Sequence, residues 1–118
     1  MILLIDDDPS FACDMATLLE PRSEFVWTNR STTGLALIRE MRPEHILVDL
    51  DLPHDLAPLD EDEGIAAVSR MSPEERTKVV VVTGSLPRLG RERLDALGVS
   101  RIHIKSDPVA QLRRMLAG

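Results

Sequence analysis

The chain has 118 residues, enough for one hydrophobic core and too few for two, so we expect a single domain over residues 1–118. Hydrophobic residues make up 43% and charged residues 29% of the sequence, the balance of an ordinary soluble globular protein, and no apolar run is long enough to cross a bilayer. The net charge of −6 disfavours a nucleic-acid-binding module, which usually has a basic face.

We expect no signal peptide in the N-terminal segment. Met1 to Ile5 is apolar and leads directly into acidic residues, without the basic region that begins a signal peptide. Cys13 is the only cysteine, so no internal disulfide can form. These features favour a protein of the reducing cytoplasm.

Short β-branched runs alternate with longer helical patterns along the chain. The four consecutive valines from Val79 to Val82 are apolar on both faces, as in a central parallel strand covered by helices on both sides. The other runs are shorter but equally apolar. The expected strands are Ile2–Ile5, Glu24–Trp27, His45–Val48, Lys78–Thr83 and Arg101–Ile104.

The first two helices have clear start and stop signals. Asp8 is an N-cap residue, Pro9 suits the first helical position, and Pro21 is expected to end this helix. Ser31 or Thr32 is expected to cap the second helix, which runs to about residue 42 before a proline.

Three further helices are expected, at about 63–71, at about 87–97 with Gly98 as its stop, and from about Asp107–Pro108 to the end of the chain. The alternating order predicts a doubly wound, flavodoxin-like α/β fold with a five-stranded parallel sheet in the order 2-1-3-4-5 and five helices. We expect no second domain within these residues after the last helix, and the sequence leaves open whether the domain stands alone or is the front part of a longer protein.

Polar side chains follow four of the five expected strands. Asp6 and Asp7 follow the first strand, Asp49 the third and Lys105 the fifth, while Thr83 ends the fourth. In a doubly wound sheet these ends open on one crevice. Adjacent carboxylates repel one another unless a cation joins them, so the cluster indicates a metal site.

The residue types suit phosphoryl transfer. Mg2+ prefers carboxylate oxygens, so we expect Asp6, Asp7 and Asp49 as its ligands, with Mn2+ able to substitute. A carboxylate can form an aspartyl phosphate without first losing a proton at neutral pH, which makes Asp49 the expected nucleophile. Lys105 would neutralise one phosphoryl oxygen and the Thr83 hydroxyl would bind another.

Over almost its whole length the chain resembles the receiver domains of bacterial response regulators, the CheY-like family of two-component signal transduction. Each motif ends an expected strand, and all occur in the right order. The matching segments are Ile2-Leu-Leu-Ile-Asp6-Asp7-Asp8-Pro9, Ile46-Leu-Val-Asp49-Leu-Asp51-Leu-Pro53, Val79-Val-Val-Val-Thr83-Gly84, and Lys105.

The resemblance implies that Asp49 accepts phosphate from a sensor histidine kinase or a histidine phosphotransfer protein in a Mg2+-dependent reaction. Asp51 would add its backbone carbonyl to the metal ligands, and Gly84, which has no side chain, would leave room for the phosphoryl group. Such a domain is not an enzyme beyond phosphorylating and dephosphorylating itself. It touches neither nucleic acid nor membrane directly.

The resemblance also implies a switch. Thr83 and Gly84 would respond to the phosphoryl group, and the residue at position 102 would follow. The output surface would be the fourth helix, the fifth strand and the last helix, including Arg88, Arg91 and Arg113, and this surface is also where a homodimer could form.

Three departures from the family pattern stand out. The acidic segment 54–63 is longer than usual and is interpreted as a solvated surface insertion. Lys105 is followed by Ser106 in place of the family's proline. Ile102 replaces the usual aromatic switch residue, so the chemistry looks intact and the relay to the output surface looks altered.

Two alternatives stay open from the sequence. A pseudo-receiver of the same fold would bind partners without phosphorylation. A haloacid-dehalogenase-like phosphatase would use Asp49 as nucleophile and Asp51 as acid–base, although that family has its nucleophile near the N-terminus and needs acidic residues after the lysine.

Overall fold

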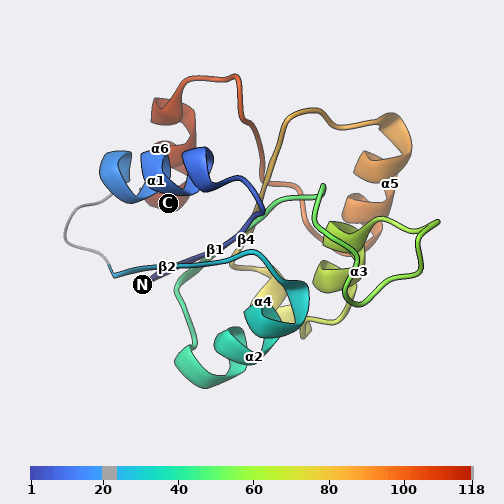
Figure 1. Cartoon of the computed structure of the whole chain (residues 1–118). Helices are drawn as coiled ribbons and strands as arrows, with labels where there is room; N and C mark the ends of the chain where they lie inside the picture. The colour runs from blue at the N-terminus through green and yellow to red at the C-terminus, as the bar shows by residue number, and fades with distance from the viewer. Residues whose placement is uncertain (20–23, 118) are drawn as a thin grey trace.

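The computed structural model describes residues 1–19 and 24–117. Five parallel strands form one sheet in the order β2-β1-β3-β4-β5, as predicted, and Figure 1 shows the helices packed around it. The expected helix stop at Pro21 lies outside the described residues. The strands are β1 (Ile2–Ile5), β2 (Phe25–Thr28), β3 (His45–Val48), β4 (Val79–Thr83) and β5 (Ile102–Ile104).

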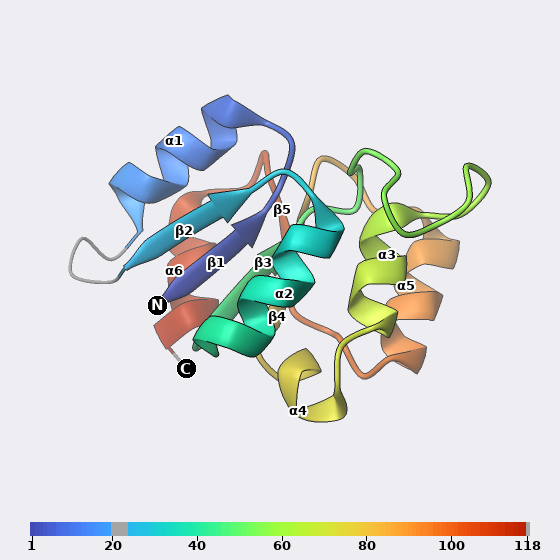
Figure 2. The ribbon, with the colours of Figure 1, turned by 60° about the horizontal axis from the view of Figure 1, so that its bottom comes forward.

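Helices cover both faces of the sheet, which confirms the doubly wound fold (Figure 2). One face packs against α1 (Pro9–Leu18) and α6 (Val109–Ala117). The other packs against α2 (Ser31–Met41), α3 (Glu63–Ser69) and α5 (Arg88–Ala96). No helix in the described part of the chain is long and apolar enough to cross a bilayer.

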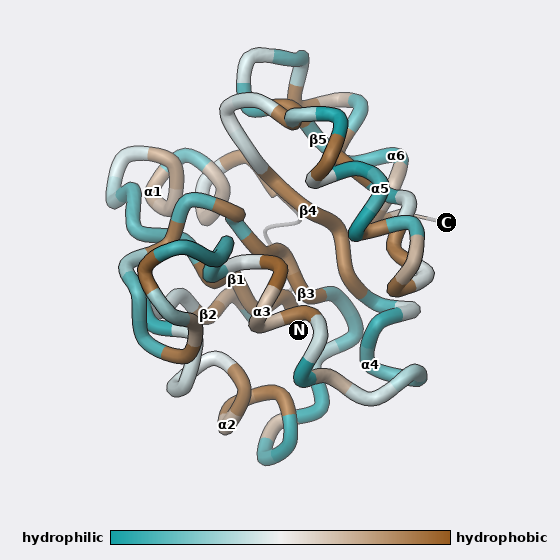
Figure 3. The backbone as a smooth tube through the Cα atoms, turned by 90° about the vertical axis from the view of Figure 1, so that its right-hand side faces the viewer, coloured by the Kyte–Doolittle hydropathy of each residue, from teal (hydrophilic) through white to brown (hydrophobic). Residues whose placement is uncertain are grey.

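The central strands consist largely of apolar residues, as the brown tube of β4 shows in Figure 3. Every residue of β1 and β4 is buried, and alternate side chains enter the two cores. Because all the strands are parallel, the polar residues that follow them gather at one edge of the sheet.

A sixth helix, α4 (Pro73–Arg76), was not predicted. It is a single turn stabilised by a capping box, in which the Ser72 hydroxyl accepts the Glu75 N–H and the Glu75 carboxylate accepts the Ser72 N–H. Five helices of the expected kind are present besides this turn.

The predicted cap of α2 is wrong. The N-cap position is Arg30, whose side chain makes no capping hydrogen bond, and Ser31 is the first helical residue. Asp55, far along the chain, takes this role: its Oδ2 accepts the Thr32 N–H at 2.9 Å and the Thr32 hydroxyl at 2.5 Å. An acid near a helix N-terminus is also favoured by the helix dipole.

The segment between β3 and α3 folds around the carboxylate of Glu63, which is 1% exposed. This carboxylate accepts the backbone N–H groups of Asp55, Leu56 and Ala57 at 2.8 to 3.1 Å. The Asp62 side chain caps α3 through the Ile65 N–H at 3.1 Å. The interpretation of 54–63 as a solvated insertion is therefore wrong for these acids, which organise the segment.

Close packing joins α3 to the strand end that carries Asp49. A Cβ atom on Gly64 would lie 2.5 Å from both the Asp49 carbonyl oxygen and the Leu50 Cα. These are backbone atoms, which cannot move aside as the end of a side chain can. Gly64 therefore allows α3 to approach the candidate site.

We expect Gly64→Ala to lower the free energy of unfolding by about 1–3 kcal/mol, because the methyl group must displace the backbone beside Asp49. Gly84→Ala is the matched control, since a Cβ there would meet nothing within 4 Å, and should change stability little. Urea denaturation measures both. Equal stability of the two variants would contradict the packing argument.

Replacing Glu63 with Gln should lower the free energy of unfolding by about 1–3 kcal/mol at pH 7, because an amide cannot accept all these N–H groups. Burial alone would raise the pKa of Glu63, but the N–H groups lower it below its ordinary value of 4.5. The stabilisation is thus fully present above pH 4.5 and is lost as the pH falls through the lower folded pKa.

Urea denaturation at pH values from 7 down to about 3 checks this expectation for Glu63. The difference in the free energy of unfolding between the native chain and Glu63→Gln should stay constant down to about pH 4.5 and narrow below it. Glu61→Gln, which changes an exposed acid of the same segment, is the control and should match the native chain throughout. If this difference in free energy stays constant over the whole pH range, the charge of Glu63 is not what stabilises the segment.

Candidate functional site

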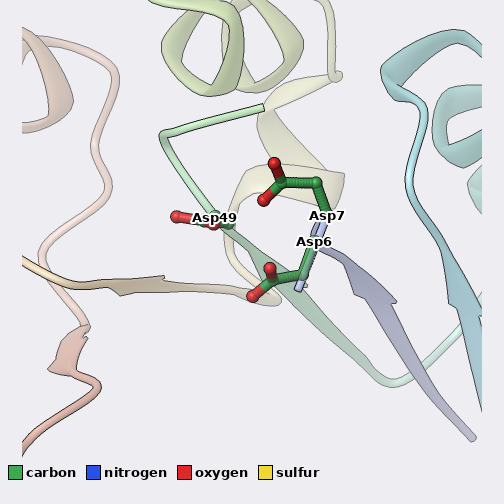
Figure 4. Close-up of side chains that lie close together, drawn as sticks. All are labelled: Asp6, Asp7 and Asp49. Carbon is green, nitrogen blue, oxygen red and sulfur yellow. The ribbon is translucent and has the colours of Figure 1, made fainter. Parts of the chain in front are cut away.

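Three predicted carboxylates meet at the ends of β1 and β3 (Figure 4). One oxygen from each of Asp6, Asp7 and Asp49 lies within 4.8 Å of the others. Asp6 is 0% and Asp49 3% exposed, whereas Asp7 is open to solvent. Carboxylates this close repel one another, so the cluster needs positive charge.

Backbone hydrogen bonds hold these residues in place. The Asp6 N–H donates to the Thr28 carbonyl at 3.0 Å, and the Asp49 N–H donates to the Ile5 carbonyl at 2.9 Å. Their side chains are also oriented, because Asp6 Oδ1 accepts the Asp8 N–H at 2.9 Å and Asp49 Oδ1 accepts the Asp51 N–H at 3.2 Å. The carboxylates of Asp6 and Asp49 are therefore oriented before any ligand binds.

Lys105 supplies positive charge to the cluster, as its position in the sequence predicted. Its Nζ lies 2.9 Å from Asp6 Oδ2 and 3.3 Å from Asp49 Oδ2. It also lies 4.5 Å from the centre of the Phe11 ring, within cation–π range. The Lys105 N–H donates to the Thr83 carbonyl at 2.8 Å, so Lys105 continues the β5 ladder although Ser106 follows it.

The electrostatics reflect burial and pairing. Burial raises the pKa of Asp6 to about 6, a shift that its bonds to Lys105 and Asp8 reduce and the Asp49 charge increases. Burial alone would lower the pKa of Lys105, but the carboxylates of Asp6 and Asp49 raise it above its ordinary value. A second cation at this site would favour the ionised form of Asp6 further.

The donor set fits a hard divalent cation. Asp6 Oδ2 is buried and receives no aligned hydrogen bond, although it forms the ion pair with Lys105. Three carboxylates that can each offer an oxygen within 4.8 Å of the others are the environment that Mg2+ prefers. Asp6, Asp7 and Asp49 would hold the ion. A ligand role for the Asp51 carbonyl stays a prediction.

The Thr83 hydroxyl is bound to the loop that follows β4. Thr83 is 1% exposed, and its hydroxyl donates to the Ser85 carbonyl at 2.9 Å. Next to it, Gly84 borders open space. Ile102 is half-buried and packs against the core that contains Val81, its partner on β4. The switch roles predicted for Thr83, Gly84 and Ile102 stay predictions.

Two residues that contact the site were not predicted. Phe11, on α1, supports Lys105, and the Trp27 indole Nε1–H donates to the Asp6 carbonyl at 2.6 Å. From the sequence alone, Phe11 is simply an apolar residue within the expected first helix. Trp27 stood out as a strand residue, and neither pattern indicates which polar group the side chain meets.

Comparisons with known proteins identify the fold. No protein-family model matches the sequence, and no curated protein is significantly similar to it. Solved structures do match. The receiver domain of a modulated diguanylate cyclase from Desulfovibrio desulfuricans G20 has a TM-score of 0.80 and 18% identity, over 98% of this chain and 89% of that one.

Two further neighbours agree. The receiver domain of a DNA-binding response regulator from Colwellia psychrerythraea 34H has a TM-score of 0.76 and 24% identity, over 98% of this chain and 94% of that one. The chemotaxis protein CheY4 of Vibrio cholerae has a TM-score of 0.76 and 18% identity, with the same coverage of 98% and 94%. The chain thus has the flavodoxin-like fold of response regulator receiver domains over nearly its whole length.

Proposed function

We propose that this chain is a phosphoacceptor receiver domain of a two-component or phosphorelay system, in which Asp49 receives the phosphoryl group. The observation that carries the proposal is the position of the buried Asp49 carboxylate, beside the Asp6–Asp7 pair and 3.3 Å from Lys105 Nζ. The partner is a sensor histidine kinase or a histidine phosphotransfer protein, and the setting is the cytoplasm.

Asp49 acts as the nucleophile. A new bond joins one of its carboxylate oxygens to phosphorus, while the bond from phosphorus to the donor's imidazole nitrogen breaks and the electron pair leaves with the imidazole. No base is required, because a carboxylate has no proton to lose. The Asp51 N–H on Oδ1 holds the carboxylate in one orientation during the attack.

The other residues neutralise charge. Bound Mg2+ would screen the negative charge of the phosphoryl oxygens from the carboxylates of Asp6 and Asp7. Lys105, already beside Asp49, would pair with a phosphoryl oxygen. The acyl phosphate on Asp49 is later hydrolysed at the same site, so self-phosphorylation and autodephosphorylation are the only catalysis that we assign to the chain.

The switch begins at Thr83. A phosphoryl group on Asp49 adds about two negative charges and strong acceptor oxygens, which compete with the Ser85 carbonyl for the Thr83 hydroxyl. A change there shifts the loop after β4 and, through Ile102, the output surface of α5, β5 and α6. That surface is also where a homodimer would form.

Incubation with Mg2+ and acetyl phosphate should give one phosphoryl adduct, recorded by intact mass. Asp49→Asn should give none, nor should the native chain in EDTA, because the acceptor and the cation are both required. Asp14→Asn, which changes an exposed acid of α1, is the control and should be modified like the native chain.

The other outcomes separate the alternatives. One structural neighbour, the RstA receiver of Klebsiella pneumoniae, is described as BeF3-activated, so beryllofluoride is a suitable second probe. No adduct and no response to beryllofluoride would contradict the proposal in favour of a pseudo-receiver. Rapid turnover of simple phosphate esters would point to a phosphatase.

Lys105→Met should slow adduct formation by about a hundredfold, because one stabilising charge at the developing phosphoryl oxygens is lost. Mg2+ binding should persist, since removing Lys105 frees Asp6 and Asp49 from a competing cation. Isothermal titration with MgCl2 and the mass assay measure the two effects. Lys105→Arg retains the charge and should lose less activity; modification of Lys105→Met at the native rate would refute the role.

A further inference from the structure

One side chain outside the acid–lysine set contacts the backbone of the metal pair. Trp27 lies on the edge strand β2, opposite Leu4 of β1, and its indole Nε1–H donates to the Asp6 carbonyl oxygen at 2.6 Å. The other side of the same residue is held by β2 as well, because the Asp6 N–H donates to the Thr28 carbonyl. Asp6 is therefore tied to β2 through both of its backbone groups.

The Asp6 carbonyl is an effective point from which to orient the pair. This carbonyl belongs to the planar peptide group that joins Asp6 to Asp7. Its direction therefore fixes the orientation of that plane, which contains the Asp7 N and Cα atoms. The Asp7 side chain is exposed, and within residues 1–19 and 24–117 no hydrogen bond orients its carboxylate. Its placement beside Asp6 and Asp49 thus depends on the backbone.

The Trp27 ring borders α1 as well as the end of β1. It is 42% exposed, and with Phe25 it lines an apolar groove between β2 and α1, whose α1 wall is formed by Pro9, Ala12, Cys13 and Ala16. The ring carries the indole N–H from this groove to the end of β1. A phenyl ring at position 27 could occupy the groove but could not donate the hydrogen bond.

We propose that Trp27 is a positioning residue for the Mg2+ site, which orients the Asp6–Asp7 peptide through its indole N–H. This inference rests on the proposed function, since it assigns Trp27 a part in the same metal site. Without the indole bond, the peptide must be ordered when the ion binds, so affinity for the ion falls while the acceptor chemistry of Asp49 is unchanged.

The test compares Trp27→Phe with the native chain. Titration with MgCl2 should give a dissociation constant about threefold to tenfold higher in the variant, the range expected for one lost hydrogen bond. The Mg2+ concentration for half-maximal phosphorylation by acetyl phosphate should rise by the same factor. The rate at saturating Mg2+ should stay within about twofold of native, because the nucleophile is untouched.

Phe25→Leu is the matched control, since it alters the same groove without removing a bond to Asp6. Its Mg2+ affinity should remain native. A metal-free thermal melt shows whether each variant is folded. Affinity that is unchanged in Trp27→Phe, or that falls equally in both variants, would overturn the role of Trp27 alone; a native chain that binds no Mg2+ would overturn this role together with the proposed metal site.

A second measurement needs no variant. Trp27 is the only tryptophan, so one indole N–H cross-peak appears in a nitrogen–proton correlation spectrum. We expect this proton to be protected from solvent exchange and its resonance to shift in step with Mg2+ occupancy. A freely exchanging indole N–H, or a resonance unmoved when Mg2+ saturates the site, would overturn the proposal.

Discussion

The contact of Lys105 with two buried carboxylates is the interaction on which the site depends. Asp6 and Asp49 are almost without solvent, and burial together with the neighbouring charge of Asp49 raises the pKa of Asp6. Lys105, which follows β5, offsets this unfavourable electrostatic energy with its positive charge. Residues 6, 49 and 105 meet only because every strand ends at the same edge, so the parallel order of the sheet and the charge balance of the site require each other.

That dependence explains why the sequence predicted so much of the fold and the acid–lysine cluster. An apolar run and the first polar residue after it are local signals, and the alternation of strands and helices fixes which ends share an edge. Asp6, Asp7, Asp49 and Lys105 meet as predicted. Where a polar residue adjoins the apolar run, the predicted start of the strand differs from the observed one by a single residue. The second strand, for example, was predicted to start at Glu24 and starts at Phe25.

The features that the sequence did not predict depend on contacts between segments that are distant in the chain. Asp55 caps α2 from a loop that follows β3, and Glu63 collects three N–H groups of that loop; an acidic run in the sequence looks the same whether its members are solvated or buried. The indole bond of Trp27 is equally invisible, because it depends on the register of β2 beside β1. The capping box from Ser72 to Glu75 was a local signal, but it supports only one turn.

The partners of Thr83 and Lys105 define the starting point of the proposed switch. Each group expected to meet a phosphoryl oxygen already has an acceptor: the Thr83 hydroxyl has the Ser85 carbonyl, and Lys105 has Asp6 and Asp49. Phosphorylation would therefore exchange one set of polar contacts for another. The net difference between two satisfied sets is small compared with either, and a bias of about 1.4 kcal/mol is enough to change their ratio roughly tenfold. A site that is well ordered without its ligand can thus still be a reversible switch.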